Sequence, residues 1–222
     1  MGILPRLPAP SDIALSAPGG PRLAGLLWPA PAGAPGVLVV HGLDSRKENH
    51  ADFAERVATR GMAALALDLR GHGASGGALD GGVLDDVLAG LDELARRGHR
   101  PLGVRGSSLG GLLALHACRV DARVRAVVAI CPARPERLAA RLGDEWPRRL
   151  SPEPPASPDG VARGYWHATG DDRVPWGATF ALAGRTPPPA RLRVVLGGDH
   201  RSLQHDPAVR AETVAFLTEH LR

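Results

Sequence analysis

Two kinds of apolar pattern alternate along this chain. Residues 37–40 form a continuous apolar run, which is typical of a strand that is buried on both faces. Residues 83–97 instead place their leucines and valines at helical spacing, and Gly98 follows as a stop signal. Such alternation predicts successive strands and helices.

Extended over the whole chain, the pattern predicts eight strands, at residues 12–17, 22–28, 37–40, 63–69, 101–104, 124–130, 165–169 and 192–196. Helices are predicted at residues 49–60, 83–97, 111–117, 135–142, 177–183 and 206–221. The first two strands flank Pro18-Gly19-Gly20-Pro21 and form an antiparallel hairpin. Repeated strand–helix units after a hairpin predict an α/β fold with a mostly parallel eight-stranded sheet and helices on both faces.

The length of 222 residues suits one domain spanning residues 1–222 with a large core. The formal net charge is +4 and the pI is near 10.0, yet Lys47 is the only lysine and the arginines are spread along the chain. A spread of this kind favours a solvated surface over a stripe that binds nucleic acid, so no nucleic-acid partner is expected. The oligomeric state stays open.

Prolines interrupt the first ten residues, where a signal peptide would need a continuous apolar core. No apolar run approaches the roughly 20 residues of a membrane span. We therefore expect a cytoplasmic protein with no membrane partner. Cys118 and Cys131 lie in apolar stretches and are interpreted as buried free thiols. Zinc-ligand spacing and a phosphate-binding loop are missing from the sequence, which predicts no metal and no cofactor.

The pentapeptide Gly106-Ser107-Ser108-Leu109-Gly110 lies between a predicted strand and a predicted helix. Gly-x-Ser-x-Gly in this setting predicts a nucleophile elbow, a strained turn with serine at its apex. Ser108 has glycine two residues away on both sides, whereas Ser107 would need glycine where Arg105 stands. Ser108 is therefore the predicted nucleophile.

Chemistry in such sheets collects at the carboxyl ends of the strands. Four further strands end in segments that carry reactive side chains, namely His41-Gly42-Leu43-Asp44, residues 68–73, Gly170-Asp171-Asp172 and Gly197-Gly198-Asp199-His200. Serine, acid and histidine follow one another in this chain order, each just after a strand. That order is the one found in α/β-hydrolases.

With these motifs, the chain from about residue 12 onward resembles serine hydrolases of the α/β-hydrolase superfamily. The segments 41–48 and 68–77 are similar to dienelactone-hydrolase-like and feruloyl-esterase-like carboxylesterases. Dienelactone hydrolases proper carry cysteine where this chain has Ser108. The acid motif usually begins His-Gly, whereas this chain has His167-Ala168.

The resemblance implies a small-molecule ester as substrate and a role for each site residue. Ser108 would attack the ester carbonyl, and His200 would take its proton and return it to the leaving alcohol. The family pattern places the aspartate three residues before the valine of Val174-Pro175, which selects Asp171 over Asp172. Of the rival histidines, His41 and His72 are interpreted as structural and His205 as a surface residue; His167 is a further rival.

Two backbone N–H groups would stabilise the oxyanion, those of Leu109 and, by alignment with His-Gly-x, Leu43. Arg46 and Lys47 lie just beyond Leu43 and could receive an acidic substrate. The favoured interpretation makes both of them solvated loop charges that pair with Glu48.

Residues 131–164 have room for one short helix and a proline-rich run at 151–158, too little for a lid of several helices. This predicts an open site for small or short-acyl esters. Trp146, Trp166 and Trp176 would either line its mouth or pack elsewhere. Thioester hydrolysis, acylaminoacyl peptide hydrolysis and cofactor-free peroxidase activity stay open as alternatives, since all use the same triad. A non-catalytic binding protein on the same fold is a remote alternative.

Overall fold

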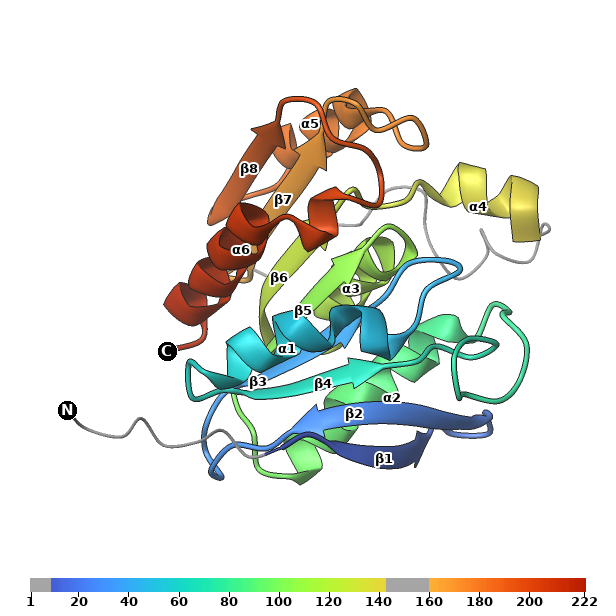
Figure 1. Cartoon of the computed structure of the whole chain (residues 1–222), viewed down its shortest axis with the longest axis vertical. Helices are drawn as coiled ribbons and strands as arrows, with labels where there is room; N and C mark the ends of the chain where they lie inside the picture. Colours follow the sequence, from blue (N-terminus) through green and yellow to red (C-terminus); the bar gives the residue numbers. More distant parts are fainter. Residues whose placement is uncertain (1–8, 143–159) are drawn as a thin grey trace.

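An eight-stranded sheet with the strand order β1-β2-β4-β3-β5-β6-β7-β8 runs through the molecule (Figure 1). The computed structural model describes residues 9–142 and 160–222. Its strands are β1 (Ser11–Ser16), β2 (Arg22–Trp28), β3 (Gly36–Val40), β4 (Ala63–Leu67), β5 (Leu102–Ser107), β6 (Val124–Ile130), β7 (Ala162–Ala168) and β8 (Ala190–Val195).

The first two strands pair antiparallel to each other, and β2 joins the sheet antiparallel to β4. Every pairing from β4 across to β8 is parallel. The mostly parallel sheet with its N-terminal antiparallel hairpin is therefore confirmed. The carboxyl ends of β3, β5, β7 and β8 lie at one edge of the sheet, where the predicted site residues follow them.

The helices are α1 (Ala51–Ala58), α2 (Val83–Arg96), α3 (Leu109–Val120), α4 (Pro135–Leu142), α5 (Trp176–Gly184) and α6 (Pro207–His220), with 3-10 turns η1 (Lys47–His50) and η3 (Leu203–His205). Figure 1 shows α1 and α6 on the near side of the sheet and α2 and α3 on the far side. The prediction of helices on both faces is confirmed.

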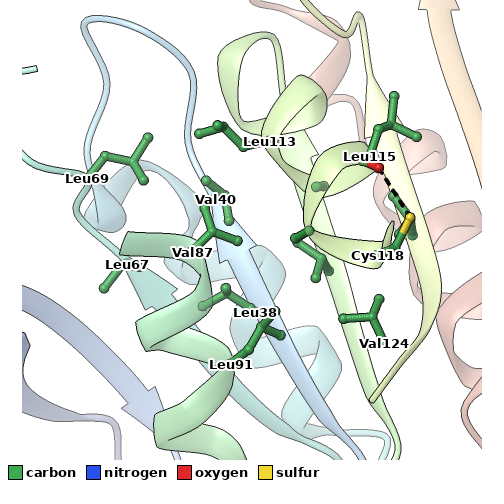
Figure 2. Close-up of a cluster of buried hydrophobic side chains, with 14 of the residues drawn as sticks. Leu38, Val40, Leu67, Leu69, Val87, Leu91, Leu113, Leu115, Cys118 and Val124 are labelled. Carbon is green, nitrogen blue, oxygen red and sulfur yellow. Dashed lines mark hydrogen bonds between the residues drawn. The ribbon is translucent and has the colours of Figure 1, made fainter. Parts of the chain in front are cut away.

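Two apolar clusters, one on each face, hold these layers together. Leu38 of β3 packs in the cluster that contains α2 and α3, and its neighbour Val39 packs in the cluster that contains α1 and α6. Successive side chains of a strand point to opposite faces, so a strand buried on both sides needs an unbroken apolar run. Figure 2 shows Leu38 beside Val87 and Leu91 of α2.

The end of β4 and the start of β7 differ from the sequence prediction, and polar groups lie at both places. The strand predicted to reach residue 69 stops at Leu67, because the N–H of Leu69 donates to the ring of His41 instead of a strand. Strand β7 begins at Ala162, three residues before the predicted start, and carries the buried side chain of Arg163. Because arginine is rarely buried in a strand, the sequence pattern did not predict that β7 begins before Arg163. At the last helix, Asp206 accepts from the N–H groups of Ala208 and Val209 and is the expected cap.

Both cysteines are buried thiols that form no disulfide within the described residues, as the sequence predicts. The thiol of Cys118 donates to the carbonyl of Leu115 at 3.3 Å (Figure 2). In the described residues, no helix has the length and apolar character that crossing a membrane requires.

Of the segment 131–164, the structure describes α4 and the start of β7. Trp146 and the proline-rich run 151–158 lie outside the described residues. Within residues 9–142 and 160–222 no additional helical layer forms a cap domain.

Candidate active site

The turn between β5 and α3 has the strained backbone that the motif predicts. Ser108 is the single residue between the two elements, with φ 51° and ψ −116°. Its N–H donates to the carbonyl of Ile130 at 2.9 Å, and its own carbonyl accepts from Leu112 and Ala133. A backbone conformation of this kind costs free energy, and it persists only where contacts with the surrounding structure hold the residue in it.

Close backbone contacts explain the two glycines of the motif. A Cβ atom on Gly106 would come closer than 3.0 Å to the carbonyl of Gly110. On Gly110 it would come equally close to the carbonyls of Val40 and His41 in the neighbouring strand end. Only residues without a side chain allow strand, turn and helix to approach one another this far.

Of the two adjacent serines, the structure brings only Ser108 to a histidine. Its Oγ lies 2.9 Å from Nε2 of His200. The Oγ of Ser107 is buried and has no hydrogen-bond partner among the residues that the structure describes. The two hydroxyls that the sequence offers are therefore in different environments, and only that of Ser108 lies beside a histidine.

The second nitrogen of His200 meets the first of the two candidate acids. Nδ1 of His200 lies 2.7 Å from Oδ2 of Asp171, whose side chain has no exposed surface. Oδ1 of Asp171 accepts from the backbone N–H groups of Arg173 and Val174 at 2.9 and 2.8 Å. Asp172 is exposed. Ser108, His200 and Asp171 form one continuous hydrogen-bonded chain.

A second histidine, His167, lies behind this acid. It is fully buried, with Nε2 3.1 Å from Oδ2 of Asp171 and 2.9 Å from the carbonyl of Val174. Its Nδ1 is 2.7 Å from Oγ1 of Thr179. From the sequence alone, His167 was a rival to His200 and had no other predicted role. Its spacing of four residues from Asp171 was the available signal for a supporting contact.

These contacts set the charge of Asp171. Burial by itself raises the pKa of a carboxyl group, but hydrogen bonds from His167 and His200 outweigh it and lower the pKa of Asp171. The backbone N–H of Val174 adds to the same effect. Asp171 is therefore a carboxylate at neutral pH and can accept a proton-bearing Nδ1 of His200.

The remaining histidines have structural positions. The Nδ1 of His41 lies 2.6 Å from the carbonyl of Gly42, and its Nε2 accepts from the N–H of Leu69. Burial lowers the pKa of His41 to about 4, so the ring is neutral. His72 contacts the carbonyl of Arg70 at 3.0 Å. The structural interpretation of both residues is confirmed. His205 is exposed, as predicted, and lies in η3.

The two residues predicted to donate to the oxyanion lie next to Ser108, one in the chain and one across the cavity lining. Leu109 is the first residue of α3, and Leu43 follows β3 and lines the cavity beside Ser108. Neither N–H donates to an acceptor in residues 9–142 or 160–222. The first N–H groups of a helix have no partner within it and lie at the positive end of its dipole. Their use as oxyanion donors stays a prediction.

A buried carboxylate holds the loop that carries Leu43. Asp68 accepts from the backbone N–H of Lys47 at 2.7 Å, from Nζ of Lys47 at 3.1 Å and from the N–H of Ala74 at 2.9 Å. The favoured interpretation of Lys47 as a solvated charge is wrong, because only 5% of its side chain is exposed. The Nζ of Lys47 does contact Glu48, at 2.6 Å. Of the two basic residues, Arg46 is the exposed one.

Arg105 is fully buried in β5, three residues before Ser108. The sequence pattern assigned it no role. Its guanidinium contacts Nδ1 of His50 at 2.8 Å, donates to the carbonyl of Gln204 at 3.0 Å and lies 4.6 Å from the ring centre of Phe53. Through these contacts it joins β5 to both 3-10 turns beside the site. A charged residue inside an otherwise apolar strand was the signal in the sequence.

A cavity of about 290 Å³ opens over Ser108 and His200. Leu43 and Asp44 line one wall, and residues of the loop before α4 and of α4 itself line another. Neither Trp166 nor Trp176 is part of its lining: Trp166 is fully buried in the core, and Trp176 packs edge-on against Phe180. Of the two alternatives for these residues, packing elsewhere is the one that the structure shows.

One group of side chains in the described part of the chain has metal-ligand spacing. Ligand atoms of Cys131, Asp171 and His200 lie within 4.8 Å of one another. Burial raises the pKa of Cys131, so its thiol is protonated, and a soft metal needs the thiolate. Asp171 and His200 are already hydrogen-bonded to each other. The arrangement suits a hydrogen-bonded acid and base better than a metal.

Comparison with known proteins agrees with this geometry. The sequence model of a family described as Serine aminopeptidase, S33 matches residues 34–155, more than half of the chain. A curated protein named Thiohydrolase, from Eupenicillium brefeldianum, is 30% identical over 122 residues. That match covers 51% of this chain and 40% of the relative, so the matched region spans less than half of the relative's length.

Solved structures share the fold at low sequence identity. A structure of DcsB in complex with its substrate analogue has a TM-score of 0.81 at 15% identity, covering 96% of this chain and 99% of that one. The alpha/beta hydrolase GrgF from Penicillium sp. sh18 has a TM-score of 0.75 at 18% identity, with coverage of 96% and 99%. The α/β-hydrolase fold is therefore confirmed, whereas similarity to dienelactone hydrolases in particular stays a prediction.

Replacing Gly110 by alanine tests the backbone contacts of the turn. We expect Gly110→Ala to lower the free energy of unfolding by about 3 kcal/mol or more, because its Cβ would overlap backbone atoms that cannot rotate away. Gly177→Ala is the matched control, since Gly177 is also the second residue of its helix and a Cβ there meets nothing within 4 Å. It should change stability by less than about 1 kcal/mol. Urea unfolding of both variants measures this; equal stabilities would contradict the account of the turn.

Proposed function

The chain belongs to the serine aminopeptidase S33 family, and from that premise we propose that it is a serine hydrolase that cleaves carboxylic esters through an acyl-enzyme. The observation that carries this proposal is the hydrogen-bonded chain from Ser108 Oγ to His200 at 2.9 Å and on to Asp171 at 2.7 Å. Nucleophile, base and orienting acid are already at hydrogen-bonding distance.

In the proposed first step, Nε2 of His200 takes the proton of Ser108 as Oγ attacks the ester carbonyl. The carboxylate of Asp171 keeps the other ring proton on Nδ1 and stabilises the imidazolium that forms. When the tetrahedral intermediate collapses, Nε2 gives its proton to the leaving alcohol. Water then attacks the acyl-enzyme with the same base, which releases the carboxylic acid and restores Ser108.

Negative charge develops on the carbonyl oxygen in both steps. We assign its stabilisation to the N–H groups of Leu109 and Leu43, which point from the start of α3 and from the loop after β3. Asp68 and Lys47 support the second donor by fixing its loop to the end of β4. The modest cavity over Ser108 suits small or short-acyl esters.

A thioester is the second candidate substrate, because the relative from Eupenicillium brefeldianum is named Thiohydrolase. The same residues would act, with a thiol leaving in place of the alcohol. Comparing kcat/KM for an oxygen ester, the matching thioester and the matching amide of one acyl group ranks the bonds directly. A preference for the amide would replace both candidates with peptide hydrolysis.

Labelling with a fluorophosphonate tests the nucleophile. We expect an adduct on Ser108 in the folded protein, and none in Ser108→Ala, whose hydrolysis of p-nitrophenyl acetate should fall by about 1,000-fold or more. Ser107→Ala is the matched control, because the neighbouring hydroxyl lacks a base, and it should still be labelled. Peptide mapping by mass spectrometry locates the adduct. Labelling of Ser107, or none in folded protein, would overturn the proposal.

The two adjacent aspartates give a matched test of the acid. Asp171→Asn should lower kcat by about 1,000-fold or more with little change in KM, because an amide cannot hold His200 in the required tautomer. Asp172→Asn alters an exposed side chain and should stay within about 2-fold of wild type. Similar losses in both variants would show that Asp171 has no special role.

The effect of Asp171→Asn on the free energy of unfolding should depend on pH. The pKa of Asp171 is lower in the folded protein than the value of about 3.9 in an unfolded chain. Its carboxylate therefore stabilises the fold above that pH, and the contribution is lost as pH falls toward the folded pKa. The difference in free energy of unfolding between wild type and Asp171→Asn should shrink on acidification below about pH 4.

A further inference from the structure

Positive charge gathers around the cavity over Ser108. Four arginines line it, Arg134, Arg137, Arg173 and Arg201, and Asp44 is the single acidic residue in its lining among the described residues. The whole chain has 27 basic and 23 acidic side chains, so composition alone does not produce this imbalance. The charge is a local property of the site.

Three of these four charges have no carboxylate partner within 4.0 Å in the part of the chain that the structure describes. Arg137 donates to the carbonyl of Arg173 at 2.6 Å, a neutral acceptor that leaves the positive charge uncompensated. The backbone N–H groups of Arg173 and Arg201 donate to Asp171 and Asp199, and neither guanidinium has a hydrogen bond or ion pair within the described residues. Arg134 has a partner, Glu136, at 3.3 Å.

The uncompensated groups lie on the side of the proposed base. Arg173 comes two residues after Asp171, and Arg201 comes directly after His200. The hydrogen bond from Arg137 joins α4 to the loop that carries Asp171. His205 also lines the cavity; partial desolvation of its ring and the nearby Arg105 lower its pKa, which disfavours a positive charge at neutral pH. The positive charge of this wall therefore comes from arginine.

Arginine is well suited to hold an anion beside a reacting group. Its planar fork of N–H donors matches the two oxygens of a carboxylate or phosphate and stays charged at every pH of interest. A cavity lined mainly by one sign of charge also raises the local concentration of the opposite sign. Because these side chains are exposed, salt should weaken the effect, with a screening length of about 8 Å at physiological ionic strength.

We propose that the substrate of this site carries an anionic group, a carboxylate or a phosphate, which Arg137, Arg173 and Arg201 hold while Ser108 attacks the ester or thioester bond. This inference rests on the proposed function and names the class of substrate. Anion recognition at this wall differs from the possibility raised by Arg46 and Lys47, since Lys47 is buried against Asp68.

Pairs of substrates that differ in one charge test the proposal. For an anion on the acyl side, we compare p-nitrophenyl hydrogen adipate with p-nitrophenyl methyl adipate. For an anion on the alcohol side, we compare p-acetoxybenzoate with its methyl ester, and p-acetoxyphenyl phosphate tests a phosphate in the same place. In at least one comparison, kcat/KM at low salt should favour the anionic substrate by about 10-fold, the size expected for one charged hydrogen bond.

Variants connect that preference to the arginines. In Arg173→Gln/Arg201→Gln the ratio of anionic to neutral kcat/KM should fall toward one, and the double lysine variant should recover part of it by restoring the charge. Arg56→Gln removes an exposed arginine of α1 that does not line the cavity, and its ratio should match wild type. In wild type, the ratio should fall as salt increases.

Two kinds of failure are distinguishable. Neutral esters cleaved as well as or better than anionic ones in every pair would overturn the inference and leave the proposed function standing. So would a preference that keeps its wild-type size in the double glutamine variant. If no ester is cleaved and Ser108 takes no phosphonate, the proposed function itself fails, and this inference fails with it.

Discussion

The close approach of backbone segments at the end of β5 is the constraint on which the rest of the site depends. Gly106 meets the carbonyl of Gly110, and Gly110 in turn meets the carbonyl of Val40. These contacts force a single residue, Ser108, to turn the chain from strand to helix in a conformation that few residues adopt. Its hydroxyl then lies at the carboxyl ends of the strands, beside the loops after β3, β6, β7 and β8.

Buried charged side chains fix the positions of those loops relative to the turn at Ser108. Asp171 connects the loop after β7 with His200, Asp68 connects the loop after β3 with the end of β4, and Arg105 connects β5 with both 3-10 turns. A buried charge costs free energy unless hydrogen bonds surround it. The carboxylates of Asp171 and Asp68 each accept at least three hydrogen bonds, so the same contacts that offset their burial also fix the positions of the site residues.

Much of this architecture is readable in the sequence, because local rules determine it. Apolar periodicity predicts all eight strands, and glycine spacing selects Ser108 over Ser107. The chain order of strand ends then points to an aspartate after β7 and to His200, and the resemblance to the family selects Asp171 over Asp172. What could not be predicted depends on contacts between segments far apart in sequence. Lys47 looks like a surface charge until Asp68, from another loop, is seen beside it. The support that His167 gives Asp171 and the cationic wall around Arg137 likewise depend on how loops meet at the sheet edge.

The central claim is that Ser108 becomes acylated during turnover. The most direct measurement is rapid acid quenching of the enzyme with a slowly hydrolysed aryl ester, followed by mass spectrometry of the intact protein and of its peptides. We expect the protein to gain the mass of one acyl group within the first turnover, located on Ser108, and to lose it again as substrate is exhausted. Turnover of the ester with no acyl mass on Ser108 at any time would contradict the account.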